Sequence, residues 1–430
     1  MDWPFFRKRA RVSVETLSTL KLSSLGFERR PSERVLRSRG RIGSFDRDTL
    51  FFDIFRSDRR DEIICLGPPI DGIEPDGFAL SFTGENFDRK IAVRYEPPRM
   101  HQQPVGRFVL SAPGLDGLKR LRIEAGGRHV VVAPGTPRIG LLAGQRVLLT
   151  LSKDNPLHWI EEWASFHVAR QGATAVLIYD NGSESYGVEE LASVLSRIPG
   201  LRRGLVVSWP FPYGVGGTAE HPALDNFCQT GMLDHARRCF CPAASSVLNL
   251  DVDELLPRKG PAIFARLEAG PLAAVHFRGL WVERDGIRDR VQVLALRHRD
   301  CDHAWRQQLE ALKSGARDRL CRTKWAAVPS RCGSGTEWGV HEVYAATPEA
   351  RETSRAWRAT DETIHYRHFR QINAGWKSDR WRSSEPFDVV CVPDKELIRN
   401  IARWGGHRKP STESKRRRRN KSRGNKAEEH

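Results

Sequence analysis

The sequence predicts an α/β protein in which a mostly parallel, Rossmann-like sheet with flanking helices follows a small β-rich domain. From Arg146 onward, short β-type runs alternate with amphipathic helical segments, the order that builds parallel sheets with right-handed crossovers. Before that point, residues 61–145 combine short β-type runs with turn dipeptides such as Asp71-Gly72. The third observation is an apolar run, residues 247–250, that leads directly into three carboxylates.

The chain of 430 residues is long enough for two or three domains, and changes in composition and hydrophobic pattern divide it into four parts. Residues 1–60 are basic and broken by Pro, Gly and Ser, so we expect an irregular segment there. Residues 61–145 form the small β-rich domain, in which no catalytic constellation is found. Residues 146–404 form the α/β domain, and residues 405–430 form a basic tail of low complexity that we expect to be disordered.

Within the α/β domain the elements follow from hydrophobic periodicity. The predicted strands are residues 147–151, 175–179, 205–209, 247–250, 273–277 and 291–296. The predicted helices are a first one that begins near Pro156 and ends at Gly172, a second over 188–198 and a third over about 225–239. The charged stretch 300–330 predicts a helix and a loop.

The net charge of +17 is concentrated in the tail, where residues 407–430 hold ten Lys or Arg against three Glu. A tail of this composition can bind anionic lipid head groups, each basic side chain contributing roughly 1 kcal/mol. Aromatic residues are not interleaved with these charges, which argues against a nucleic-acid platform built on base stacking. Two alternatives therefore stay open for the tail, a solvated, disordered tether and a contact with an anionic membrane surface, whereas nucleic acid is not an expected partner.

Cysteine usage and the absence of targeting signals indicate the compartment. The eight cysteines form no Cys-x-x-Cys pair, so we expect free thiols in a reducing environment. The first residues carry no apolar segment typical of a signal peptide, and no run of eighteen apolar residues occurs. We expect a soluble, cytoplasmic protein that can lie against the inner face of the plasma membrane.

The acidic stretch after residues 247–250 is the strongest candidate for chemistry. In extended chain, side chains at i and i+2 point the same way, so Asp251 and Asp253 converge while Val252 faces back into the protein. Convergent carboxylates at the carboxyl end of a buried strand suit Mn²⁺ or Mg²⁺ and the phosphates that such a cation holds. The alternative is a solvated acidic turn that closes a strand.

Several short motifs occur together in one order, namely Lys153-Asp154-Asn155, Glu161-Glu162-Trp163, His167, Ile178 to Ser183, Gln229, Asp251 to Pro257, Lys324, His341, His365-Tyr366 and Lys377. As a set they resemble the motifs of glycosyltransferases of the type-A (GT-A) fold, most narrowly family 92 and its bacterial relatives. The resemblance covers about residues 146–385. It departs from the family at Asp154-Asn155, where Asn-Glu is usual, and at Leu255, where Phe is usual.

The resemblance implies a hexosyltransferase-type enzyme (EC 2.4) of polysaccharide biosynthesis. Such an enzyme uses a metal ion to transfer a sugar from a nucleotide-sugar donor, for which the resemblance implies a UDP-linked sugar, to a glycan, lipid-linked or other hydroxyl acceptor. The implied metal ligands are Asp251, Asp253 and His341. The implied donor-binding residues are Asp180, Asn181, Ser183, Gln229, Asp251 and Lys324.

Some roles stay open at the level of sequence. An inverting enzyme needs a carboxylate base, and Glu254, Glu283 and Glu337 are equal candidates. Asp180 and Asn181 suit an Asx-turn as well as donor binding. The pair Glu162 and His167 could serve only to brace their helix against the sheet. The sequence names neither the sugar, the acceptor nor the stereochemical outcome.

Two other classes of function compete with sugar transfer. Phosphohydrolases of the haloacid-dehalogenase type also use Asp-x-Asp after an apolar strand, but Leu255 stands where they need Thr or Val. Their motif also opens its domain, whereas here it follows three predicted strands. The second rival is a basic scaffold that binds membranes or RNA, in which the acidic strand end is purely structural.

Overall fold

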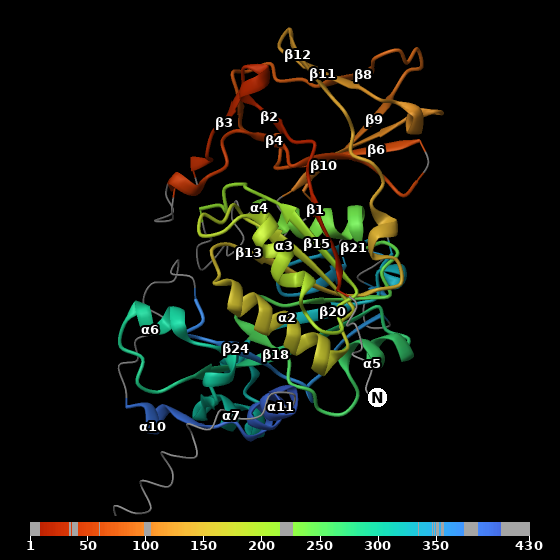
Figure 1. Cartoon of the computed structure of the whole chain (residues 1–430). Helices are drawn as coiled ribbons and strands as arrows, with labels where there is room; N and C mark the ends of the chain where they lie inside the picture. Colours follow the sequence, from red (N-terminus) through yellow and green to blue (C-terminus); the bar gives the residue numbers. More distant parts are fainter. Residues whose placement is uncertain are drawn as a thin grey trace, which may run out of the picture.

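The computed structural model describes residues 9–33, 36, 42–59, 61–98, 105–215, 227–333, 335–345, 347, 349, 352–353, 357–373 and 386–405. Figure 1 shows a β-rich N-terminal part on top of an α/β part, with β1 reaching from the first toward the second. Lys377 and all but the first residue of the predicted tail lie outside the described residues.

A mixed sheet of twelve strands, counted over the described residues, forms the centre of the α/β part. Its main path is β1 (Arg11–Glu15), β15 (Arg203–Ser208), β14 (Ala175–Asp180), β13 (Arg146–Ser152), β16 (Ser246–Asn249), β20 (Cys321–Ala327), β18 (Ala274–Glu283), β19 (His303–Trp305) and β25 (Cys391–Pro393). Three further strands are β17 (Glu254–Leu255), β23 (Arg358–Thr360) and β24 (Tyr366–Phe369). The first five strands of the path are parallel, and β20 runs antiparallel between β16 and β18.

Helices cover both faces of this sheet. They are α2 (Leu157–Gln171), α3 (Val188–Ser196), α4 (Phe227–His235) with the π-turn η5 (Ala236–Phe240), α5 (Ile263–Ala269), α6 (Arg290–Ala295), α7 (Arg306–Ser314), α10 (Phe387–Val390) and α11 (Lys395–Gly405). In β13, Leu148 belongs to one apolar cluster and its neighbours Val147 and Leu149 to another, so both faces of the sheet are buried. The predicted fold class is therefore confirmed.

The N-terminal part consists of small antiparallel sheets around a separate apolar core. Its strands are β2 (Leu20–Lys21), β3 (Glu28–Arg29), β4 (Thr49–Phe51), β5 (Asp53–Arg56), β6 (Glu62–Gly67), β7 (Ile73–Glu74), β8 (Ser81–Gly84), β9 (Ala92–Glu96), β10 (Gly106–Ser111), β11 (Leu121–Ala125) and β12 (Arg128–Val132). A further hairpin, β21 (Thr336–Trp338) and β22 (Val343–Ala345), lies in the C-terminal half of the chain.

Two local expectations differ from the structure. The sequence predicts an irregular segment over residues 1–60, yet β2 to β5 belong to the β-rich part. Strand β1 joins the main sheet, because Val12 and Val14 pack against a core that is distant in sequence. The predicted strand 291–296 is helix α6, because the Asp289 carboxylate accepts a hydrogen bond from the Gln292 N–H and caps a helical turn.

All eight cysteines lie among the described residues, and none of them forms a disulfide. Over the same described ranges, no helix has the length and apolar character needed to cross a membrane.

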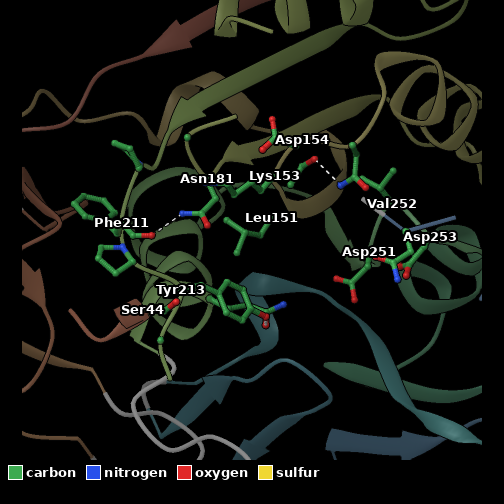
Figure 2. Close-up of a pocket in the computed structure, with 18 of the residues that line it drawn as sticks. Ser44, Leu151, Lys153, Asp154, Asn181, Phe211, Tyr213, Asp251, Val252 and Asp253 are labelled. Carbon is green, nitrogen blue, oxygen red and sulfur yellow. Dashed lines mark hydrogen bonds between the residues drawn. The ribbon is translucent and has the colours of Figure 1, made fainter. Parts of the chain in front are cut away.

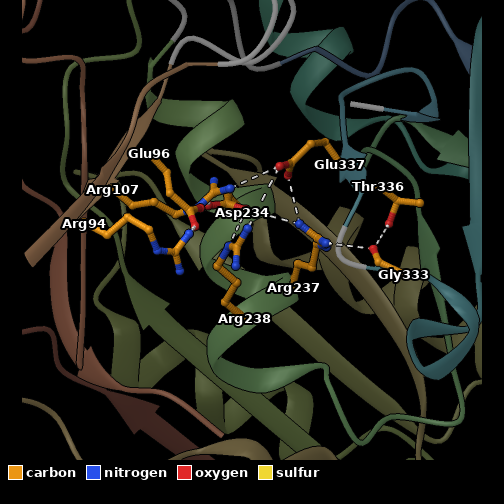
Figure 3. Close-up of polar contacts among 9 residues, drawn as sticks. All are labelled: Arg94, Glu96, Arg107, Asp234, Arg237, Arg238, Gly333, Thr336 and Glu337. Carbon is orange, nitrogen blue, oxygen red and sulfur yellow. Dashed lines mark hydrogen bonds and ion pairs between the residues drawn. The ribbon is translucent and has the colours of Figure 1, made fainter. Parts of the chain in front are cut away.

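A buried ionic network joins the N-terminal part to the α/β part (Figure 3). The Arg107 guanidinium on β10 lies 3.1 Å from the Asp234 carboxylate of α4 and 3.2 Å from the Glu337 carboxylate of β21. Arg237 binds the other oxygen of Glu337 at 2.9 Å. Burial opposes ionisation of Asp234, but Arg238 and Arg107 outweigh it and hold the pKa of this carboxyl below its usual range. Arg107 of the N-terminal part therefore adds one shared cation to two carboxylates with which Arg237 and Arg238 of the α/β part also pair.

We expect Arg107→Met to lower the free energy of unfolding by about 1.5–3 kcal/mol, because the substitution removes the charge-assisted hydrogen bonds of Arg107 while Arg238 and Arg237 stay on Asp234 and Glu337. Urea unfolding measures the change. The matched control is Arg122→Met on β11, where the arginine pairs with Glu124 at the surface and the expected change is below about 1 kcal/mol. Equal effects of the two substitutions would show that the network does not hold the two parts together.

Candidate active site

Three segments meet at one edge of the main sheet because β14, β13 and β16 are parallel neighbours. Asn181-Gly182 follows β14, residues 152–155 close β13, and Asp251 to Asp253 follow β16. They line a pocket of about 650 Å³ (Figure 2). The other lining residues are Gly43, Ser44, Leu151, Pro210, Phe211, Pro212, Tyr213, Gly214, Gln229, Ile372 and Asn373.

A buried lysine neutralises the acidic motif. The Lys324 ammonium, on β20, lies 2.7 Å from the Asp251 carboxylate and 3.2 Å from the Glu254 carboxylate. Burial alone would lower the pKa of Lys324, but Asp251 and Glu254 outweigh burial and raise the pKa above its usual range. The Asp251 side chain is 35% exposed and lines the pocket, so the buried ion pair has one face toward the ligand space.

Asp253, Glu254 and His368 form a group whose ligand atoms all lie within 4.8 Å of one another. Pairing of β17 with β24 sets Glu254 opposite His368. The His368 imidazole lies 3.1 Å from the Asp253 carboxylate through Nε2 and 3.7 Å from Glu254 through Nδ1. Trp281 stacks on the same imidazole, with 4.1 Å between ring centroids. Two carboxylates and one imidazole fit a divalent cation such as Mn²⁺.

Glu254 is almost fully buried. Burial raises the pKa of its carboxyl well above the usual range, and the charges of Asp251 and Asp253 add to the rise while Lys324 opposes it. Glu254 therefore binds a proton more readily than an exposed glutamate does. A divalent cation beside it would displace that proton.

His341, which the resemblance implied as a metal ligand, is not part of this three-residue group. Its Nδ1 lies 3.1 Å from the carbonyl oxygen of Thr323. Burial and the Lys324 ammonium lower the pKa of His341 to about 4. The sequence analysis missed His368, because the strand pairing that brings it to Glu254 spans more than a hundred residues and leaves no local spacing to recognise.

The residues after β14 shape the pocket. The Asp180 carboxylate accepts hydrogen bonds from the Ser183 hydroxyl at 2.5 Å and from the Ser183 N–H at 3.1 Å, which is the turn considered as the alternative to donor binding. The Asn181 amide donates to the carbonyl oxygens of Trp209 and Phe211, at 2.8 Å each. Gln229 lines the pocket and accepts a hydrogen bond from the Tyr213 hydroxyl at 2.8 Å.

The three base candidates lie in different places. None of the three is among the described residues that line the pocket. Glu254 belongs to the carboxylate–imidazole group, whereas Arg107 and Arg237 hold Glu337 in the ionic network between the two parts. Glu283 lies two residues beyond Trp281 on β18, so both side chains are on the face that carries His368. Its carboxylate accepts hydrogen bonds from the Trp305 indole and the Arg370 guanidinium.

Helix α2 braces the loop that carries the acidic motif. His167 Nδ1 bonds the Trp163 carbonyl oxygen at 2.8 Å, which leaves Nε2 to accept the Leu256 N–H at 3.1 Å. The Glu162 carboxylate accepts the His298 N–H at 2.9 Å, and the His298 imidazole lies 2.8 Å from the carbonyl oxygen of Val252. Glu162 and His167 thus act on the backbone on both sides of Asp253.

Comparison with known proteins gives distant similarity in structure alone. No protein-family model matches the sequence, and no curated protein sequence is similar to it. Glucosyl-3-phosphoglycerate synthase from Mycobacterium tuberculosis, in complex with Mn²⁺, uridine diphosphate and glucosyl-3-phosphoglycerate, is 14% identical with a TM-score of 0.24, covering 54% of this chain and 72% of that one. The same enzyme in complex with uridine diphosphate is 13% identical with a TM-score of 0.23, and the match covers 63% of this chain and 84% of that one. A further mycobacterial protein is 16% identical with a TM-score of 0.26, covering 54% and 67%. At these TM-scores the likeness assigns no activity to this chain.

His167, which braces the acidic loop from helix α2, makes the free energy of unfolding depend on pH. Burial lowers the pKa of His167 to about 3, so the folded protein keeps this imidazole neutral while the unfolded chain protonates it near pH 6.5. Its stabilising contribution is therefore complete above about pH 6.5 and is lost as the pH falls toward 3. Between pH 7 and pH 5 the loss from this group alone is about 2 kcal/mol.

We expect the stability difference between wild type and His167→Gln to shrink by about 2 kcal/mol from pH 7 to pH 5, because glutamine does not titrate. Urea unfolding of both proteins at the two pH values measures it. A difference that is the same at both pH values would contradict the neutral, buried imidazole.

Proposed function

We propose that the chain is a glycosyltransferase of the type-A fold that uses Mn²⁺ or Mg²⁺ to transfer a sugar from a UDP-linked donor to a hydroxyl acceptor. The observation that carries the proposal is the group of Asp253, Glu254 and His368 beside a pocket at the carboxyl edge of a parallel sheet. A volume of about 650 Å³ is in the range of cofactor and nucleotide sites. The narrower relation to family 92 stays a prediction from the motifs.

In this proposal Asp253 and His368 hold the divalent cation, with Glu254 as the third ligand. When bound, such a cation neutralises the charge that develops on a leaving diphosphate. Asp251 lines the pocket and is positioned by Lys324, so its outward oxygen can accept a hydrogen bond from the donor ribose. Lys153 also lines the pocket and supplies a positive charge for the phosphates.

For an inverting reaction we propose Glu283 as the base that takes the proton of the acceptor hydroxyl. It shares a face of β18 with Trp281, whose ring stacks on His368, so its carboxylate lies on the metal side of the sheet. The Trp305 and Arg370 donors hold one of its oxygens and fix its direction. We further propose a glycan or lipid-linked acceptor, as in polysaccharide biosynthesis.

We expect Asp253→Asn to abolish Mn²⁺-dependent binding of UDP without unfolding the protein. Asparagine keeps the shape of the side chain but loses the charge that a hard cation requires. Calorimetric titration of UDP, with Mn²⁺ and then with chelator, measures the change, and Asp116→Asn at an exposed turn of the N-terminal part is the matched control. Wild-type protein that binds no UDP in either condition would contradict the proposed function, and unchanged binding by Asp253→Asn would place the metal elsewhere.

We expect removal of the chain from Gly405 onward to weaken association with anionic vesicles and to leave UDP binding unchanged, because the tail supplies basic charge and the described residues that line the pocket all precede it. Co-sedimentation with vesicles that contain phosphatidylserine measures association, and neutral vesicles are the control. Equal co-sedimentation of full-length and shortened protein would rule out the tail as a membrane tether.

A further inference from the structure

We propose that the N-terminal part supplies the wall against which the nucleoside of the donor lies, with Gly43 and Ser44 facing the loop from Phe211 to Gly214. This inference rests on the proposed function, because it needs a nucleoside diphosphate in the pocket. It gives the N-terminal part a role in donor binding that its sequence does not reveal.

The pocket has two chemically different ends. Figure 2 shows Ser44 and Phe211 at one end and Asp251 and Asp253 at the other. A diphosphate held at Asp253, with the adjoining ribose at Asp251, leaves the Ser44 end for the base of the nucleoside. Figure 2 shows the rings of Phe211 and Tyr213 on the Ser44 side, and flat aromatic surfaces suit the face of a base.

Ser44 is held in place by both parts of the molecule. It closes the 3₁₀ turn η2 (Ile42–Ser44), and its carbonyl oxygen accepts the Gly214 N–H at 3.0 Å. The next residue, Phe45, is buried in the same apolar cluster as Phe52 and Phe211. The Phe52 ring lies 4.7 Å from the Phe211 ring.

The loop that faces Ser44 is fixed from two sides. From the N-terminal part, Phe52 packs on Trp209 and Phe211, with 5.0 Å between the ring centroids of Phe52 and Trp209. From the strand end of β14, the Asn181 amide binds the carbonyl oxygens of the same two residues. A shift of the N-terminal part would therefore move the pocket loop.

A second buried cluster anchors the strand that follows Phe52. The Asp53 carboxylate lies 2.9 Å from the Arg138 guanidinium and 3.0 Å from the His235 imidazole. The other nitrogen of His235 lies 2.9 Å from the Tyr179 hydroxyl, on β14 of the main sheet. These buried bonds set the distance between wall and sheet before a ligand arrives, so the nucleoside end is preformed.

The test adds a bulky side chain to the wall and compares two ligands. In Ser44→Trp we expect binding of UDP with Mn²⁺ to weaken at least tenfold, while binding of inorganic pyrophosphate with Mn²⁺ stays unchanged. Gly43→Leu is a second wall variant, since a Cβ at Gly43 meets no atom within 4 Å and the fold tolerates it. Ser81→Trp, on an exposed strand position of the same part, is the control and should change neither titration.

The outcomes separate this inference from the proposed function. Unchanged UDP binding in both wall variants would overturn the inference, and so would equal losses for UDP and pyrophosphate, because the effect would then not be confined to the nucleoside end. Wild-type protein that binds pyrophosphate with Mn²⁺ but not UDP would also overturn the inference, while the metal site would stand. Wild-type protein that binds neither would contradict the proposed function and the inference with it.

Discussion

The candidate site depends on one buried charge, the Lys324 ammonium between Asp251 and Glu254. Three carboxylates within four residues repel one another, and burial makes that repulsion stronger. The Lys324 ammonium, 2.7 Å from the Asp251 carboxylate and 3.2 Å from the Glu254 carboxylate, offsets this repulsion. It does so from outside the group of Asp253, Glu254 and His368. Lys324 has this position because β20 enters the sheet antiparallel, directly beside β16. The strand order of the sheet therefore also sets the charge balance of the site.

Around this charge pair, the acidic loop is held mainly through its backbone. The Val252 carbonyl oxygen and the Leu256 N–H are bound by buried imidazoles, and the Leu256 carbonyl oxygen accepts the Gln171 amide. Backbone anchoring leaves the carboxylates of Asp251 and Asp253 directed at the pocket. Because its backbone is anchored and its carboxylates are not, a loop rich in charge can keep one geometry, as a metal site requires.

The N-terminal part is joined to the α/β part by buried ions as well as by aromatic packing. Arg107 and Asp53 each pair with partners on α4, and Phe52 packs against the pocket loop. Buried pairs of this kind contribute less to net stability than to a defined arrangement, because desolvation offsets much of their attraction. A defined arrangement of the two parts is what the proposed wall of the pocket requires.

The sequence by itself determined the features that local periodicity encodes. The strand–helix alternation from Arg146, the helix that ends at Gly172 in a left-handed turn (φ 77°) and the acidic strand end were all readable, because each depends on neighbours a few residues apart. Only the tertiary structure decided that β20 carries Lys324 beside Asp251, that His368 faces Glu254, that Glu337 serves the contact between the parts, and that Ser44 borders the pocket. These contacts join segments dozens to hundreds of residues apart, and their free energy comes from strand pairing and buried charge that leave no periodic trace in either segment.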